Sequence, residues 1–239
     1  MSVLEHLAEL RRRLIVVSLS LLGFIVLTYW KISWIIKILL VPLQRYKLQL
    51  VYFSLVEGFM TRIKIALVLS LIIISPVIIY QFIAFIQPAL SKKERRFFLT
   101  ALFYLTASFM IGASFGFTIV LPASLNFFVT FGKSYLTPVF SGSAYFSFLM
   151  MLCLICGFIF LIPFALVFLG RLGLISSNSL KKWRKTVLIV LIATGGILAP
   201  ATDWLTFMLL GLPVFILYEL SIWVIFFLER ARRKNVDVI

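Results

Sequence analysis

Few residues of this 239-residue chain could do chemistry, since it has only eight acidic residues, one histidine and two cysteines. His6 alone cannot supply a bis-histidine haem or a histidine-rich metal centre. Cys153 and Cys156 form a C-x-x-C inside an apolar run, where buried thiols are more often structural than redox-active. The chain has neither the phosphate-binding G-x-x-x-x-G-K-[ST] nor the zinc-binding H-E-x-x-H. We therefore expect no enzyme, no metal and no cofactor.

Two of the carboxylates lie among basic residues. Glu9 precedes Arg13 by four residues, so a helical surface ion pair is one interpretation. Glu94 lies in Ser91-Lys-Lys-Glu-Arg-Arg96, at the spacing of a helix capping box from Ser91. Either carboxylate could instead accept an incoming guanidinium in a charge-assisted, bidentate pair. From these residues alone, both interpretations stay open.

Three further acids differ in their surroundings. We expect Glu57 to cap a short external helix and Asp203 to cap the last membrane span. Glu219 lies within an apolar run, where an ionised carboxylate costs roughly 2.5–3.5 kcal/mol on insertion scales. Such a residue is usually functional, and Arg171 and Gln81 are its candidate polar partners.

The elements that position these residues must lie in a membrane. Apolar residues make up 63% of the chain and charged residues 13%, with a mean hydropathy of +1.14, which no water-soluble domain of this size could bury. The 23 Lys and Arg against eight acids give a net charge of +15. Because the basic residues cluster at the ends of apolar runs, they indicate orientation in a bilayer, and we expect no nucleic-acid partner.

The apolar runs predict an all-α integral membrane protein with six transmembrane helices. Sixteen of the 23 basic residues fall on one side of this arrangement, so both termini are expected inside. Pro122 should end the third span, residues 132–147 should form an external loop, and the last two helices should be short. The expected spans in one polytopic domain are residues 14–31, 64–88, 97–121, 147–169, 186–201 and 204–228.

Two motifs resemble those of a known family. His6-Leu-Ala-Glu-Leu-Arg-Arg-Arg-Leu14 resembles the HLxELRxRL signature of the twin-arginine protein translocase C subunit, TatC. Ser75-Pro-Val-Ile-Ile-Tyr-Gln-Phe-Ile-Ala-Phe-Ile-Gln-Pro-Ala-Leu-Ser-Lys-Lys-Glu-Arg-Arg96 is similar to that family's SPVIxYQxxxFIxPALxxxERR stretch. The likeness runs nearly end to end, through Leu121-Pro122, Leu198-Ala-Pro-Ala-Thr-Asp203 and Leu217-Tyr-Glu219.

This resemblance implies a receptor and core subunit of the twin-arginine translocation system. Its members bind the signal peptides of folded precursors and assemble, in an oligomeric complex, with single-span partners of the TatA and TatB type. The protonmotive force then drives export across an energy-transducing membrane: the bacterial cytoplasmic membrane, or the mitochondrial inner or thylakoid membrane if organelle-encoded. The resemblance implies that the signal peptide is bound by Glu9, Arg11, Phe85 and Glu94. It also implies that translocation or partner contact involves Pro42, Glu57, Asp203 and Glu219.

One position departs from the family pattern. The fourth span often carries FExP there, whereas this chain has Ile159-Phe-Leu-Ile-Pro163, with Leu161 in the place of the acid. The alternative function is a secondary transporter of a small solute that uses Glu219 and Gln81 at mid-membrane. Such a transporter would work without partners.

Overall fold

The computed structural model of the chain describes residues 3–46, 50–86, 98–131, 139–171, 173–198 and 204–236. It is almost wholly helical, which confirms the all-α class. The helices are α1 (Val3–Trp30), α2 (Ile32–Leu39), α3 (Val41–Gln44), α4 (Glu57–Ile73), α5 (Ser75–Ile86), α7 (Phe98–Phe115), the π-helical turn η2 (Gly116–Val120), α8 (Leu121–Phe131), α9 (Gly142–Arg171), α10 (Ser177–Leu198) and α11 (Trp204–Val236). Two short strands, β1 (Leu50–Val51) and β2 (Phe140–Ser141), pair in parallel.

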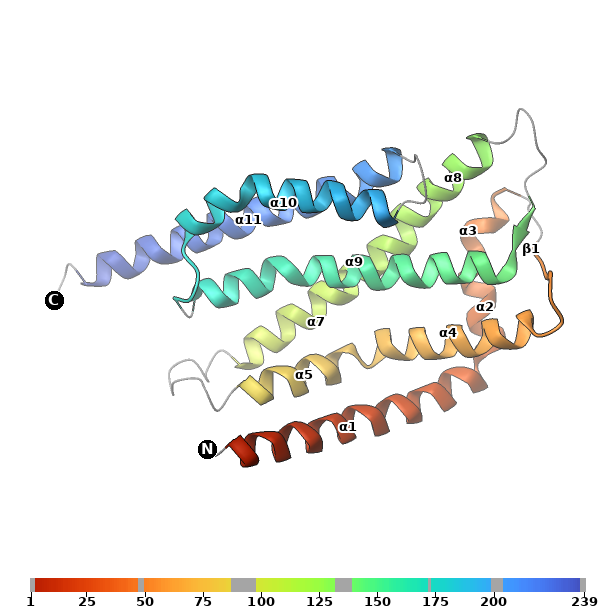
Figure 1. The fold of residues 1–239 in the computed structure, drawn as a ribbon, viewed down its shortest axis with the longest axis horizontal. Helices are drawn as coiled ribbons and strands as arrows, with labels where there is room; N and C mark the ends of the chain where they lie inside the picture. Colours follow the sequence, from red (N-terminus) through yellow and green to blue (C-terminus); the bar gives the residue numbers. More distant parts are fainter. Residues whose placement is uncertain are drawn as a thin grey trace.

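The long helices lie side by side, and α2 and α3 run across one end of them (Figure 1). Helix α1 packs on α4 and α5, α7 packs on α9, and α10 packs on α11. The starts of α1 and α10 and the end of α11 lie at the same end of the molecule, on the left of the view. The N-terminus and C-terminus therefore lie on the same side of the molecule, where α11 extends beyond the start of α1.

Four helices in the described ranges are long and apolar enough to cross a membrane: Glu5–Trp30, Thr100–Thr130, Gly142–Arg171 and Gly211–Arg230. The α4–α5 pair makes a fifth if its two parts form one broken span, since they bend by 51°. Pro76 lies in the first turn of α5, where its missing N–H interrupts the helical hydrogen bonds. The structure thus gives four or five candidate spans, and the count of six remains a prediction.

Three sequence-based boundaries were wrong. The third span does not end at Pro122, because η2 resets the helical register just before it and a proline is tolerated in the first turn of α8. Residues 142–147 belong to α9 rather than to a loop. The last two helices are not short: α10 has 22 residues and α11 has 33, because Lys and Arg continue a helix well beyond its apolar part.

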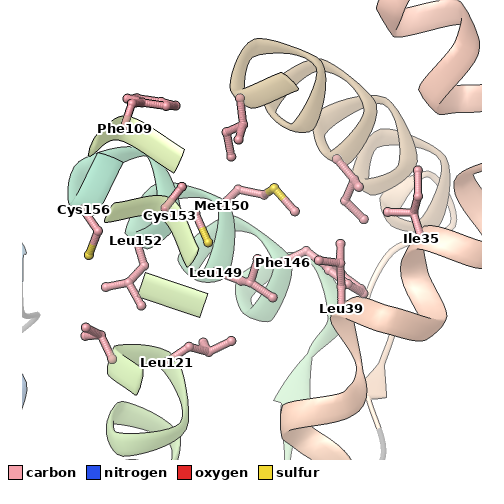
Figure 2. Packing of buried hydrophobic residues seen from close by; sticks show 14 of the residues in the cluster. Ile35, Leu39, Phe109, Leu121, Phe146, Leu149, Met150, Leu152, Cys153 and Cys156 are labelled. Carbon is pink, nitrogen blue, oxygen red and sulfur yellow. The ribbon is translucent and has the colours of Figure 1, made fainter. Parts of the chain in front are cut away.

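The core lies where α7 meets α9 (Figure 2). A Cβ on Gly112 would come within 2.7 Å of the Phe160 Cβ, and a Cβ on Gly157 within 2.7 Å of the Phe109 ring, so both glycines permit close helix approach. Cys153 and Cys156 are buried free thiols on this face of α9, as their structural interpretation predicts. The letters G-A-S-F-G at 112–116 also match a hydrolase nucleophile pattern, but here they run from the last turn of α7 into η2 and not through the strand-to-helix turn that such a nucleophile needs.

Candidate signal-peptide site

Arg13 joins the first helix to the end of α5. Its Nε and Nη2 donate to Glu9 Oε1 at 3.1 and 2.5 Å, which confirms the predicted i,i+4 pair. The guanidinium also donates to Gln81 Oε1 at 3.1 Å and to the Ala84 carbonyl at 3.0 Å. A residue of α1 therefore holds two residues of α5 at the end of the molecule where α1 starts.

An aromatic contact lies beside this network. His6 stacks on Phe85, with ring centroids 4.3 Å apart and planes inclined by 26°. On a helix of 3.6 residues per turn, His6, Glu9 and Arg13 share one face. The structure thus brings two of the expected site residues, Glu9 and Phe85, to one place, between α1 and α5.

Only one of the two carboxylate oxygens of Glu9 accepts a hydrogen bond from the described residues. Its Oε1 accepts both bonds from Arg13, whereas its Oε2 is buried and has no hydrogen-bond partner among the described residues. A buried acceptor without a donor is costly, so this oxygen is a ready acceptor for a further N–H group. The carboxylate therefore has unused acceptor capacity on Oε2 while Oε1 holds Arg13.

The structure describes only one of the other two expected binding residues, Arg11, and places it away from this cluster. Arg11 is exposed and lies about 200° around α1 from Glu9, so it faces the other way, beside Leu7 and Leu14. Glu94 lies outside the described residues, in the segment 87–97 that follows α5.

Pro42 lies at the opposite end of the molecule from Glu9. It is buried in α3, in the first turn, where proline is well suited to a helix start. Helix α3 packs on α8, and the Tyr46 hydroxyl donates to the Pro122 carbonyl at 3.2 Å. Pro42 therefore lies where α3 packs on α8.

Glu57 does not cap a short external helix, as the sequence suggested. It begins the 17-residue α4, and its carboxylate instead caps α9: Oε1 accepts from Ser143 N at 3.0 Å and from Ser141 Oγ at 2.5 Å. Its Oε2 accepts from Phe53 N at 2.7 Å. Because these donors come from two segments far apart in the sequence, Glu57 fastens the β1–β2 ladder to the starts of α4 and α9.

Glu219 pairs with a residue that sequence reasoning missed. Its Oε2 lies 2.6 Å from Arg184 Nη2, which joins α11 to α10. The candidate partner Gln81 accepts from Arg13 instead. Arg184 had been counted only among the basic residues that set orientation, and no local spacing signals a pair between residues 35 apart. Asp203 lies outside the described residues.

The family of the chain follows from comparison with known proteins. A family model described as "Sec-independent protein translocase protein (TatC)" matches residues 5–213. A Sec-independent protein translocase protein TatC of Aquifex aeolicus is 36% identical and covers 100% of this chain and 99% of its own length. A chloroplastic TATC of Pisum sativum is 33% identical over 94% of this chain and 64% of its own length.

A solved structure agrees with these sequence matches. The crystal structure of a twin arginine translocase receptor, TatC, superposes with a TM-score of 0.83 at 34% identity, covering 94% of this chain and 99% of that one. The chain therefore belongs to the TatC family of Sec-independent protein translocase proteins, which are components of a translocase and not enzymes.

Proposed function

We propose that this chain is the receptor that binds the twin-arginine signal peptide of folded precursors, with Glu9 and Glu94 accepting the two guanidinium groups. The observation that carries the proposal is the buried Oε2 of Glu9, which has no hydrogen-bond partner in the part of the chain that the structure describes. Glu9 lies against the end of α5, and the chain leaves that end for the segment that contains Glu94. Two carboxylates on adjoining segments suit two consecutive arginines.

The arrangement of Arg13 supports recognition of arginine. Arg13 holds Glu9 through a single oxygen, so an incoming guanidinium can use the other oxygen once the side chains that cover it move aside. A hydrogen bond to a charged group contributes about 1.5–3 kcal/mol when partly shielded from water. Lysine cannot form the same planar, two-donor contact, so a Lys-Lys peptide should bind less well.

The aromatic contact supplies the second half of the proposed site. His6 and Phe85 present a stacked pair beside Glu9, which can contact the apolar part of a signal peptide next to its arginines. Arg11 lies on the other side of α1, so we propose that it contacts the precursor or a partner at a point away from the arginine pair.

Transport itself would need the other proposed residues and the partners. In our proposal the chain has six spans with both termini inside, in an energy-transducing membrane, and it assembles with single-span TatA-type and TatB-type subunits into an oligomeric complex driven by the protonmotive force. Pro42 and Glu57 would act by holding the external segment, and Glu219 and Asp203 by shaping the α10–α11 region that a partner helix meets.

Photo-crosslinking tests the receptor site. A twin-arginine signal peptide with a photoreactive residue beside the arginine pair is added to the full-length protein in membrane vesicles. We expect labelling near Glu9, and at least a fivefold loss with Glu9→Gln, with Glu94→Ala and with a Lys-Lys peptide.

Glu5→Gln provides the matched control, because it removes the same charge from the same helix one turn earlier. Its labelling should stay within twofold of the wild type. Unchanged labelling in both Glu9→Gln and Glu94→Ala would overturn the site, and the solute-transporter alternative would then need a test by uptake into vesicles that contain this protein alone.

A further inference from the structure

Helix α10 has an exposed face that changes from basic to apolar along its length. Lys181, Lys182 and Lys185 are all exposed in its first turns. Leu188 and Ile189 follow on the same face and are 44% and 64% exposed. The face therefore begins with cations at the end of the molecule where the termini lie and continues into hydrocarbon-like surface.

The helical spacing aligns these two parts. Ile189 lies four residues after Lys185 and seven after Lys182, so their side chains lie one and two turns apart on one face. At 1.5 Å per residue, the lysines and the apolar pair are separated by about 5–10 Å along the axis. This is the distance over which a membrane changes from phosphate groups to acyl chains.

The three lysines are available for a ligand. In the part of the chain that the structure describes, none of them forms an ion pair. The nearby acids are already engaged: Glu219 pairs with Arg184, and Glu229 accepts from both the backbone N–H and the hydroxyl of Ser177. The lysine charges are thus not neutralised by the described side chains of α10 and α11.

Two aromatic side chains lie beside the lysines on this face. Trp183 is 62% exposed, and tryptophan is enriched where a membrane meets water. Lys181 Nζ lies 5.1 Å from the centre of the Phe226 ring, so its stem follows apolar surface while its ammonium group stays at the edge. An exposed tryptophan beside lysines whose stems follow apolar surface is the pattern typical of the headgroup level of a membrane.

We propose that Lys181, Lys182 and Lys185, together with Leu188 and Ile189, form a binding site for one anionic phospholipid of the leaflet next to the chain termini. The lysines bind the phosphate headgroup and the apolar pair contacts an acyl chain. Helix α10 is not one of the helices apolar enough to span alone, and it packs on α11, so a bound lipid also covers the face of α10 that the protein leaves bare. The charge of the site selects anionic over zwitterionic lipids.

Native mass spectrometry of the full-length protein tests this site. The protein is titrated with phosphatidylglycerol or with zwitterionic phosphatidylcholine, and the bound lipids are counted. Each lysine at an anionic surface is worth up to a factor of about five. We expect K181Q/K182Q/K185Q to lower the affinity for phosphatidylglycerol at least tenfold and to leave phosphatidylcholine binding within twofold. The milder variant K182Q/K185Q keeps the Lys181–Phe226 contact. Its affinity for phosphatidylglycerol should fall at least fivefold, and it replaces the triple variant if that one fails to fold.

K31Q/K37Q/R62Q is the matched control, because it removes three exposed charges near α2 and the start of α4, at the opposite end of the molecule from the start of α10. It should bind phosphatidylglycerol within twofold of the wild type. An equal loss in the control would show general charge attraction and overturn the site. Tighter binding of a soluble poly-glutamate peptide than of phosphatidylglycerol would also overturn it, because the face would then suit an acidic protein segment.

Discussion

Arg184 and Glu219 form an ion pair with N and O atoms 2.6 Å apart, which joins α10 to the apolar part of α11. The pair continues a series of contacts along this hairpin. Glu229 binds Ser177 near the start of α10, and the Tyr218 hydroxyl donates to the Leu180 carbonyl at 2.7 Å. Glu219 therefore has a charge partner within the protein, and its cost inside an apolar helix is offset by Arg184.

A double-mutant cycle should measure this pair. Glu219→Gln and Arg184→Gln each leave a charge without its partner, so each should lower the thermal midpoint of the purified protein. The double variant should be more stable than the sum of the single effects predicts, by about 1 kcal/mol, because the pair is partly exposed. Additive effects would mean that the two side chains do not interact in solution.

Removal of the Glu57 carboxylate should loosen the β1–β2 ladder and the starts of α4 and α9. Glu57→Ala leaves three donors, the N–H groups of Phe53 and Ser143 and the Ser141 hydroxyl, without their acceptor. We expect a loss of about 1–3 kcal/mol in the free energy of unfolding. Hydrogen exchange should speed up at residues 50–57 and 140–144 but not in α11. Protection unchanged at both segments would contradict this role.

Gly112 should tolerate no side chain. A Cβ there would overlap the Cys156 carbonyl and lie 2.7 Å from the Phe160 Cβ, so Gly112→Ala should push α7 away from α9 and cost about 1–3 kcal/mol. Gly23→Ala is the control, because a Cβ at Gly23 meets no atom within 4 Å. It should be neutral or should stabilise α1 by about 0.5–1 kcal/mol. Equal thermal midpoints for the two variants would argue against the close helix contact.

Gln81 should matter for signal-peptide binding without touching the peptide. Its side-chain oxygen fixes Arg13, which in turn fixes the Glu9 carboxylate. Gln81→Leu removes this acceptor at similar volume, so photo-crosslinking of the signal peptide should fall about two- to fivefold, the effect of one ordinary hydrogen bond. Gln81→Glu keeps an acceptor and should retain labelling. A loss with Gln81→Glu as large as with Gln81→Leu would contradict a role through Arg13.

Features that depend on neighbouring residues could be predicted from the sequence, whereas contacts between residues far apart in the sequence could not. The Glu9–Arg13 pair was predictable because i and i+4 are neighbours on any helix. The membrane class was predictable because it follows from composition alone. In contrast, the Arg184–Glu219 pair depends on how α10 and α11 align, and the capping of α9 by Glu57 joins residues 84 and 86 apart in sequence.

The predictions of helix boundaries were wrong where a residue or an apolar run fits two structures. Pro122 can end a helix or begin one, and only the π-helical turn before it decides in favour of a new start. The short apolar runs near the C-terminus predicted short helices, but both helices continue beyond their apolar parts through residues that include Lys and Arg. Hydropathy measures the depth of hydrocarbon that a helix can cross, not the length of the helix.

The parallel pairing of Leu50 with Phe140 and of Val51 with Ser141 has a mechanical consequence. Both strands lead into long helices, α4 and α9, which start at the same end of the molecule and run in the same direction (Figure 1). Glu57 connects the ladder to the starts of both helices. A force on the ladder therefore acts on two helices rather than on one. A force applied to the ladder would therefore move α4 and α9 together.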